Sequence, residues 1–249
     1  MRLFGLIGFP LSQSGSPGIF SRIFRESAAD DASYELFEIS SLKELTDLLT
    51  GRNEIEGFNV TIPYKKQIIP LIHRLDETAM KAGAVNCVKV NRQKKGIVLK
   101  GFNTDYPAFL QTIEKTGLDY SKKVLILGKG GSSGAVAAAL NDMKIDFLTV
   151  SRSKDRGDIT YDEIGKDLLK EVQLIVNTTP LGMYPCTDRY PHLPYHYLTP
   201  DHICYDLVYN PPMTLFLRKS KEQGAAVVNG GEMLKVQAWM SWKIWGGDL

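Results

Sequence analysis

The stretch Asn59-Val-Thr-Ile-Pro-Tyr-Lys65 places an amide, a hydroxyl and an amine within seven residues. Val60 and Ile62 are apolar and β-branched, so we expect the stretch to form the end of a strand. Pro63 cannot donate to a sheet ladder and marks where strand pairing stops. Lys65 then lies just past a strand end, where α/β sheets usually bind ligands. A partly desolvated lysine there can exchange protons near neutral pH; a solvated loop lysine is the alternative.

Two further strand-like runs end in polar side chains. Ala84-Val-Asn86 closes a short apolar run with an amide, and Asn103-Thr-Asp105 follows the apolar stretch Ile97-Val-Leu99. Asp105 precedes Tyr106-Pro107, so it also fits the N-cap of a helix with proline in its first turn. Polar groups at neighbouring strand ends can converge on one polyhydroxylated ligand, so the sequence favours a ligand site here.

Strand-like and helix-like segments alternate along the chain, which predicts an α/β fold with a mostly parallel sheet. The last expected helix carries Trp239, Trp242 and Trp245 at three-residue spacing, which we interpret as core packing. The expected strands cover residues 3–8, 34–39, 57–61, 85–90, 97–101, 123–127, 147–150, 174–176, 203–207 and 226–228, and the expected helices cover 16–26, 42–49, 76–82, 106–117, 135–140 and 232–245.

A glycine-rich loop, Gly128-Lys-Gly-Gly-Ser-Ser-Gly134, lies between an apolar strand and an alanine-rich helix. This pattern is close to the dinucleotide fingerprint, except that Ser133 stands where the third glycine would be. Glycine lets the backbone approach a pyrophosphate, and the helix N-terminus offers free N–H groups. The alternative is a tight strand-to-helix turn without a ligand.

The end of the following strand indicates which dinucleotide would bind. Ser151-Arg-Ser-Lys154 has no carboxylate before Asp155, whereas an acidic residue would be expected for the ribose of NAD. Arg152 can form a charge-assisted fork with a 2′-phosphate. The segment therefore favours NADP over NAD, with a surface turn carrying two cations as the alternative.

Composition narrows the class of protein. The chain has 249 residues, 43% of them hydrophobic and 23% charged, and a net charge of +2, which suits a soluble globular protein and gives no case for nucleic acid or a membrane. Cys87, Cys186 and Cys204 are three in number and far apart, which argues against a disulfide framework and favours the cytoplasm. His192 and His196 lie in a proline-broken segment, so we expect no metal site.

Seven motifs together resemble those of shikimate dehydrogenases in order and spacing. The resemblance covers essentially the whole chain, and each motif is weak by itself. The motifs are Gly8-Phe-Pro10 with Ser14-Gly-Ser-Pro17, the Asn59–Lys65 stretch, Asn103-Thr-Asp105, the loop at Gly128, Asn177-Thr-Thr-Pro-Leu-Gly-Met183, Asp206-Leu-Val-Tyr-Asn-Pro211 and Met233-Leu-Lys-Val-Gln237.

The resemblance implies two domains and a set of site residues. Residues 1–104 plus 231–249 would form an α/β substrate domain, to which the C-terminal helix returns, and residues 105–230 a Rossmann-type doubly wound NADP-binding domain. Lys65 and Asp105 would be catalytic. The substrate residues would be Ser14, Ser16, Thr61, Asn86, Tyr209 and Gln237, and the cofactor residues Gly128, Gly130, Gly131, Ser132, Ser151, Arg152, Ser153, Lys154, Thr178, Met183, Leu207 and Gly230.

The implied reaction is reversible hydride transfer between NADPH and 3-dehydroshikimate, which gives shikimate. The implied protein is a monomer or homodimer that has no macromolecular partner. Lys65 would supply a proton or polarise the carbonyl oxygen while Asp105 orients it, and the two could titrate as a coupled pair. Three departures from the family pattern are Gln13 for histidine, Glu232 for a smaller neutral residue, and serines on both sides of Arg152. Alternatives are a quinate or aminoshikimate dehydrogenase of the same fold, or a non-catalytic NADP sensor.

Overall fold

The computed structural model describes residues 1–12 and 14–246. The chain divides into two compact units: residues 1–107 with the chain from Lys235 onward, and residues 108–234. Both boundaries fall inside helices, namely α5 (Asp105–Ile113) and α9 (Gly231–Trp245). Within the described residues each unit is built on one six-stranded sheet.

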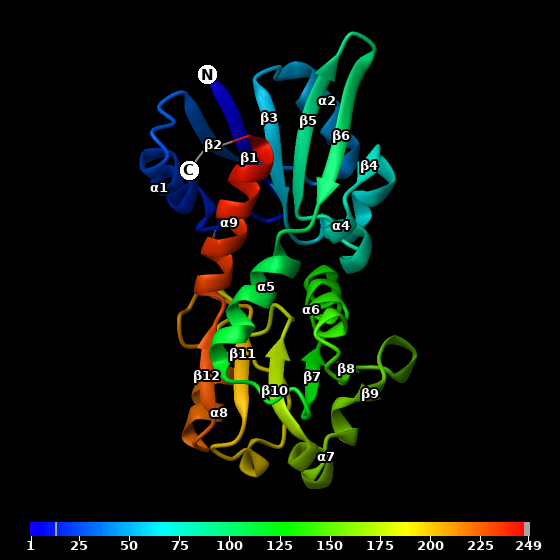
Figure 1. Ribbon diagram of the computed structural model, residues 1–249, viewed down its shortest axis with the longest axis vertical. Coiled ribbons are helices and arrows are strands. Elements are labelled where there is room, and N and C mark those ends of the chain that lie inside the picture. The colour runs from blue at the N-terminus through cyan, green and yellow to red at the C-terminus, as the bar shows by residue number, and fades with distance from the viewer. Residues whose placement is uncertain (13, 247–249) are drawn as a thin grey trace. The chain divides into compact units, whose positions relative to one another are not determined.

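The sheet of the first unit is mixed, with the strand order β2-β1-β3-β5-β6-β4 (Figure 1). β1 is parallel to β2 and β3, whereas β5 and β6 form an antiparallel hairpin beside β3. The expected mostly parallel arrangement therefore holds only for part of this sheet. The strands are β1 (Arg2–Gly8), β2 (Ala32–Glu38), β3 (Ile55–Val60), β4 (Arg74–Leu75), β5 (Cys87–Gln93) and β6 (Gly96–Phe102).

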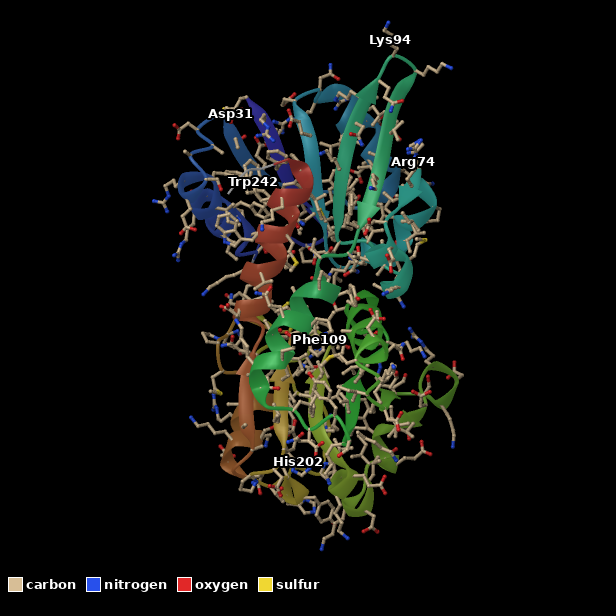
Figure 2. The ribbon with its side chains drawn as sticks, in the orientation of Figure 1. Asp31, Arg74, Lys94, Phe109, His202 and Trp242 are labelled. Atoms are coloured by element: carbon tan, nitrogen blue, oxygen red, sulfur yellow. The ribbon has the colours of Figure 1, made fainter. Side chains whose placement is uncertain are left out.

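Helices cover both faces of this sheet. On one face α1 (Ser16–Glu26) and α9 enclose an aromatic cluster in which Trp242 meets Phe4 edge-on and Trp245 stacks on Phe4 at 4.7 Å between ring centroids (Figure 2). Packing of the tryptophans in the core, as expected, is confirmed for Trp242 and Trp245, which are buried. The other face packs against α2 (Leu45–Gly51), α3 (Tyr64–Gln67) and α4 (Glu77–Ala82).

The sheet of the second unit is wholly parallel among its described strands. Its order, β12-β11-β10-β7-β8-β9, is that of a doubly wound Rossmann fold, with β7 first in the chain and the order reversing between β7 and β10. Near-continuous apolar strands are expected where both faces are buried. The strands are β7 (Lys123–Leu127), β8 (Phe147–Ser151), β9 (Ile159–Thr160), β10 (Val172–Asn177), β11 (Ile203–Asp206) and β12 (Ala226–Asn229).

Alternate residues of these strands supply two cores. Leu125 and Leu127 face α7 (Lys166–Glu171) and α8 (Leu215–Glu222) through Leu169 and Phe216. On the other face Phe109 of α5 meets Tyr205 edge-on at 5.4 Å between ring centroids (Figure 2), and α6 (Gly131–Asp142) buries its alanine-rich side.

Several expected elements differ in detail from the structure. The hairpin strands run through Gln93 and from Gly96, so the basic segment 91–95 is mostly strand and only its tip turns. The expected helix at 42–49 divides into a 3-10 turn and α2. The short elements α3, α7, β4 and β9 were not expected, nor was the amphipathic helix α8. The 3-10 helices are Leu42–Glu44, Ile69–Leu71, Glu114–Thr116, Lys154–Arg156, Tyr161–Glu163 and Tyr195–Tyr197.

Within residues 1–12 and 14–246, no helix combines the length and the apolar character that a membrane span requires.

Candidate active site

The first unit brings Lys65 and Asp105 into direct contact. Lys65 lies in α3, just after β3, and its Nζ donates to Asp105 Oδ2 at 2.7 Å. The two side chains are only 15% and 10% exposed. A charge-assisted pair in such a sheltered position holds the lysine Nζ in a defined place.

The short helix that carries Lys65 is anchored on both sides. The Tyr64 hydroxyl donates to the Ile39 carbonyl at 2.9 Å, and the Tyr64 ring packs in the core. The Val85 N–H donates to the Lys65 carbonyl at 2.7 Å. The Lys65 backbone is therefore tied to the entry of β5 as well as to the core.

Asp105 does not have the capping role that its position suggested. It is the first residue of α5, and the first-turn N–H of Tyr106 donates instead to Asn103 Oδ1 at 2.9 Å. Asn103 is itself fixed because its Nδ2 donates to the Ala84 carbonyl. The expectation of an Asp105 cap is therefore corrected: Asn103 satisfies the helix terminus, and the Asp105 carboxylate faces Lys65.

A buried network of amides and hydroxyls surrounds Asn86. The Thr104 N–H donates to Asn86 Oδ1 at 2.7 Å, and Asn86 Nδ2 donates to Thr104 Oγ1 at 3.0 Å. Thr104 Oγ1 also lies 3.3 Å from Gln237 Oε1 on α9. Two of the predicted substrate residues, Asn86 and Gln237, are thus brought together in the structure through Thr104.

The network extends to residues that sequence analysis did not assign. Asn59 Nδ2 donates to Ser241 Oγ at 2.8 Å and to the Asn86 carbonyl at 3.1 Å. Ser241, which is fully buried, donates in turn to the Gln237 carbonyl. Asn59 and Thr104 stood inside quoted motifs, but nothing in the sequence around Ser241 signalled a partner on a distant strand.

The segment that carries Ser14 and Ser16 follows the end of β1, and Thr61 follows the end of β3. The Ser14 N–H donates to the Leu11 carbonyl, and the Leu11 N–H donates to Glu38 Oε2 at 2.6 Å. Thr61 packs so closely on β1 that a Cβ at Gly8 would lie 2.5 Å from its Cγ2. Gln13, the departure noted above, lies outside the described residues.

In the second unit the glycine-rich loop lies where the strand order reverses. Gly128 follows β7 with a φ of +107°, a backbone conformation that favours glycine, and a Cβ there would lie 2.8 Å from Thr179 Cγ2. Thr178 and Thr179 follow β10, on the other side of the reversal. Gly130 precedes the first turn of α6, so Gly131 and Ser132 present a helix N-terminus at this point.

The segment Ser151–Lys154, at the end of β8, exposes two cations, Arg152 and Lys154. Burial raises the pKa of Tyr161, and the nearby charge of Arg152 opposes that shift. Lys154 instead pairs with Glu163 at 3.1 Å, so part of its charge is already balanced. Ser151 and Ser153 flank Arg152, with the Ser153 N–H directed at Ser151 Oγ.

The remaining predicted residues of this unit lie after β10, β11 and β12. Gly230 has no room for a side chain, since a Cβ would lie 2.2 Å from the Leu207 carbonyl oxygen. Met183 is exposed, and Tyr209 is half-buried. Tyr209, unlike the other predicted substrate residues, belongs to the second unit.

Sequence analysis missed one buried carboxylate. Asp206 ends β11 with no exposed surface, and burial raises its pKa to about 6. It accepts hydrogen bonds from Asn177, Val208 and Thr214. Asp206 lies in the Asp206–Pro211 motif, but no pattern around it predicted that the carboxylate would be buried.

Metal-ligating side chains do not cluster in the described residues, where no group of three or more His, Cys, Asp or Glu could hold an ion. All three cysteines are unpaired thiols.

A doubly wound unit with a glycine turn at its switch point, together with a separate unit that holds a sheltered lysine–carboxylate pair, is typical of dinucleotide-dependent oxidoreductases. The family model described as "Shikimate dehydrogenase substrate binding domain" matches residues 6–88. The "Shikimate dehydrogenase (NADP(+))" of Methanococcus maripaludis is 35% identical, over 99% of this chain and 92% of that protein. The chain belongs to the shikimate dehydrogenase family.

Solved structures agree with this assignment. The shikimate 5-dehydrogenase of Thermus thermophilus in complex with NADP(H) and shikimate matches with a TM-score of 0.85 and 31% identity, over 100% of this chain and 95% of that one. A quinate dehydrogenase of Corynebacterium glutamicum in complex with NAD matches with a TM-score of 0.84 and 25% identity, over 99% and 94%.

Proposed function

We propose that the protein catalyses the reversible NADPH-dependent reduction of 3-dehydroshikimate to shikimate, a step in the biosynthesis of chorismate and the aromatic amino acids. The observation that carries the proposal is the 2.7 Å contact between Lys65 and Asp105 in the unit that matches the family's substrate-binding domain. A curated relative at 35% identity over nearly the full chain carries the same activity in its name.

The two parts of the chain would divide the work. Residues 1–104 plus 231–249 would bind substrate and carry the catalytic pair, and residues 105–230 would bind NADP. The first assignment is supported by the family match, and the second by the Rossmann strand order. Gln237 of α9 lies within hydrogen-bonding distance of Thr104, which supports its place in the substrate site of the first unit.

The residues present fit NADP. The absence of a side chain at Gly128 leaves open the space that a Cβ would occupy beside Thr179, and α6 begins directly after Gly130. These features suit a pyrophosphate, and the exposed Arg152 suits a 2′-phosphate. Gly131, Ser132, Ser151, Ser153, Lys154, Thr178, Met183, Leu207 and Gly230 would complete the cofactor site.

Bound NADPH would supply the hydride, and the protein's own groups would handle the resulting charge. As the carbonyl oxygen of the substrate gains negative charge, Lys65 Nζ would donate a proton or a hydrogen bond to it. Asp105 would hold that amine in place and accept from a substrate hydroxyl.

The remaining polar groups suit a substrate with one carboxylate and three hydroxyls. Ser14, Ser16 and Tyr209 would donate to the carboxylate, and Thr61, Asn86 and Gln237 would bind hydroxyls. Amides both donate and accept, as hydroxyl recognition requires. Because Thr104 already engages the Asn86 amide, only part of the Asn86 hydrogen-bonding capacity is available to a ligand.

Quinate is the second candidate substrate, because the matched quinate dehydrogenase structure is almost as similar by TM-score as the matched shikimate enzyme. The two activities separate in one assay. Purified protein is mixed with shikimate or quinate and with NADP or NAD, and kcat/KM is measured at 340 nm. We expect the highest kcat/KM for shikimate with NADP. A higher value for quinate would contradict the substrate assignment, and no turnover would favour a non-catalytic sensor.

The assembly and location of the enzyme are also proposals. We propose a monomer or homodimer that acts on small molecules alone. A cytoplasmic location is supported by the three unpaired thiols, since an oxidising compartment favours disulfides.

A further inference from the structure

Asp206 stands at the centre of a fully buried polar network in the second unit. Its Oδ1 accepts from Asn177 Nδ2 at 2.9 Å and from the Val208 N–H at 3.0 Å. Its Oδ2 accepts from Thr214 Oγ1 at 2.5 Å. Asp206 and Asn177 are neighbours across the last register pair of β11 and β10, so one carboxylate reaches three chain segments.

The first segment is the loop after β10. Asn177 Oδ1 accepts from both the N–H and the hydroxyl of Thr179, at 3.0 and 2.6 Å. Thr179 Cγ2 is the atom that a side chain at Gly128 would strike. The orientation of Asn177, which Asp206 fixes, therefore sets the surface against which the glycine turn packs.

The second and third segments lie after β11. The Val208 N–H bond fixes the chain directly after Leu207, whose carbonyl oxygen lies against Gly230. Thr214 is the N-cap of α8, where its Oγ1 also accepts from the Leu217 N–H. The Thr214 Cβ in turn lies 3.3 Å from where a Cβ at Gly182 would be, and Gly182, with a φ of +87°, precedes Met183.

We infer that Asp206 is a positioning residue for the nicotinamide half of NADP: it holds the loops at Thr178–Thr179, Leu207 and Met183 in one arrangement through its two carboxyl oxygens. The inference rests on the proposed function, which assigns these loops to the cofactor. A doubly wound sheet binds one half of a dinucleotide on each side of its switch point. Arg152 follows β8 and would bind the 2′-phosphate of the adenosine half, so the loops after β10 and β11, on the other side of the switch point, would face the nicotinamide half. Asp206 is fully buried, so it would act through its three partners and not by touching the cofactor.

The acceptor oxygens, and not the net charge, are what the loops require. Asn177 and Val208 both donate to Oδ1, an atom that asparagine retains. The Thr214 hydroxyl can rotate to accept from an amide in place of donating to Oδ2. Asp206→Asn should therefore keep the loops in place, whereas Asp206→Leu, of similar volume, would remove the acceptor of three buried donors, Asn177 Nδ2, the Val208 N–H and the Thr214 hydroxyl.

The test compares two ligands by isothermal titration calorimetry. NADP has a nicotinamide half, whereas adenosine 2′,5′-bisphosphate has only the adenosine and its 2′-phosphate. We expect Asp206→Leu to raise the Kd for NADP by roughly tenfold or more, because the loops lose the acceptor that holds them in one arrangement. The Kd for adenosine 2′,5′-bisphosphate should stay within about twofold, and Asp206→Asn should bind both ligands like wild type.

Each other outcome has a definite meaning. An unchanged NADP Kd in Asp206→Leu, or equal weakening of both ligands, would overturn the inference, because the second result describes general damage to the unit. Failure of the wild-type protein to bind NADP would overturn the proposed function instead. If Asp206→Leu does not fold, Thr179→Val removes the hydroxyl that Asn177 accepts and keeps the contact with Gly128; the same selective loss of NADP binding is expected, and its absence would overturn the inference.

Discussion

Lys65 Nζ lies 2.7 Å from Asp105 Oδ2, although the two residues are 40 positions apart in the chain. α3 starts at Tyr64, shortly after β3 ends at Val60, and α5 starts at Asp105, shortly after β6 ends at Phe102, so each side chain lies close to the end of a strand. Asn103 takes over the hydrogen bond to the first turn of α5, which leaves the Asp105 carboxylate for the lysine. The site therefore depends on a division of labour between two side chains of one short motif.

Arg152→Ala should raise the KM for NADP and leave the KM for NAD nearly unchanged. The guanidinium is proposed to pair with the 2′-phosphate, and the loss of a hydrogen bond to a charged group costs roughly 1.5–3 kcal/mol, about 10- to 150-fold. Arg156→Ala, at the end of the 3-10 helix Lys154–Arg156 that follows Arg152, is the matched control and should alter neither constant. Equal effects of Arg152→Ala on the two cofactors would show that this arginine does not bind the 2′-phosphate.

Gln237→Ala should raise the KM for shikimate and largely spare kcat. An uncharged amide holds a hydroxyl equally well in the ground and transition states, and the loss of such uniform binding appears in KM. The measurement is steady-state kinetics at saturating NADP, with the exposed Gln223→Ala as control. A large fall in kcat with an unchanged KM would place Gln237 in the transition state instead.

Ser241→Ala should also raise the KM for shikimate, although Ser241 is not expected to touch substrate. Its hydroxyl accepts from Asn59 and donates to the Gln237 carbonyl, so its removal loosens the backing of Asn86 and α9. We expect a stability loss of about 1–3 kcal/mol as well. Ser220→Ala removes an equally buried helical serine in the second unit and should cost stability without changing the KM for shikimate. Identical KM changes in both variants would contradict this role.

The stability of the protein should depend on Asp206 at mildly acidic pH. Its folded pKa, raised by burial to about 6, exceeds the ordinary value of 3.8. The folded state therefore binds more protons than the unfolded state between these values, so the unfolding free energy falls as pH rises through that window, by roughly 3 kcal/mol for the full shift. Burial, with a smaller contribution from the Asp206 charge, raises the pKa values of Cys204 and Tyr195 further above neutrality, so both groups stay uncharged in this window.

Chemical denaturation of wild type and Asp206→Asn at several pH values isolates this effect. Other carboxylates contribute equally to both proteins and cancel in the difference. Relative to wild type, the Asn variant should gain stability as pH rises from 4 to 7. A difference that does not vary with pH would show that Asp206 keeps an ordinary pKa.

Much of the fold could be predicted because strands and helices have different apolar periods. The expected segments 16–26 and 123–127 match α1 and β7 as observed. Short elements such as β4 and β9 have only two residues each, too few to show a period. The hairpin of β5 and β6 was cut short in prediction because its basic tip resembled a longer turn, whereas pairing continues through Gln93.

Residues of the candidate site could be predicted only where the residue type and its place beside a strand or helix together indicate a function. Lys65 after a strand and Gly128 before a helix carry their chemistry in their identity and position. Ser241 and Asp206 do not, because their roles depend on partners brought near by tertiary packing. Asn103, Thr104 and Asp105 form one motif, and the sequence alone does not show which of them caps the helix. That choice depends on the hydrogen bonds of Thr104 to Asn86 and of Asn103 to Ala84.

The central claim, that Lys65 acts on the reacting oxygen, is tested most directly by kcat for shikimate oxidation in Lys65→Ala at saturating shikimate and NADP. Removal of a general acid or base typically costs about 10²- to 10⁴-fold in rate, so kcat should fall by that factor with a smaller change in KM. Lys66→Ala, at the exposed neighbouring lysine, should retain wild-type kcat. A Lys65→Ala enzyme with near-wild-type kcat would contradict the account and leave Asp105 or a bound water as the proton carrier.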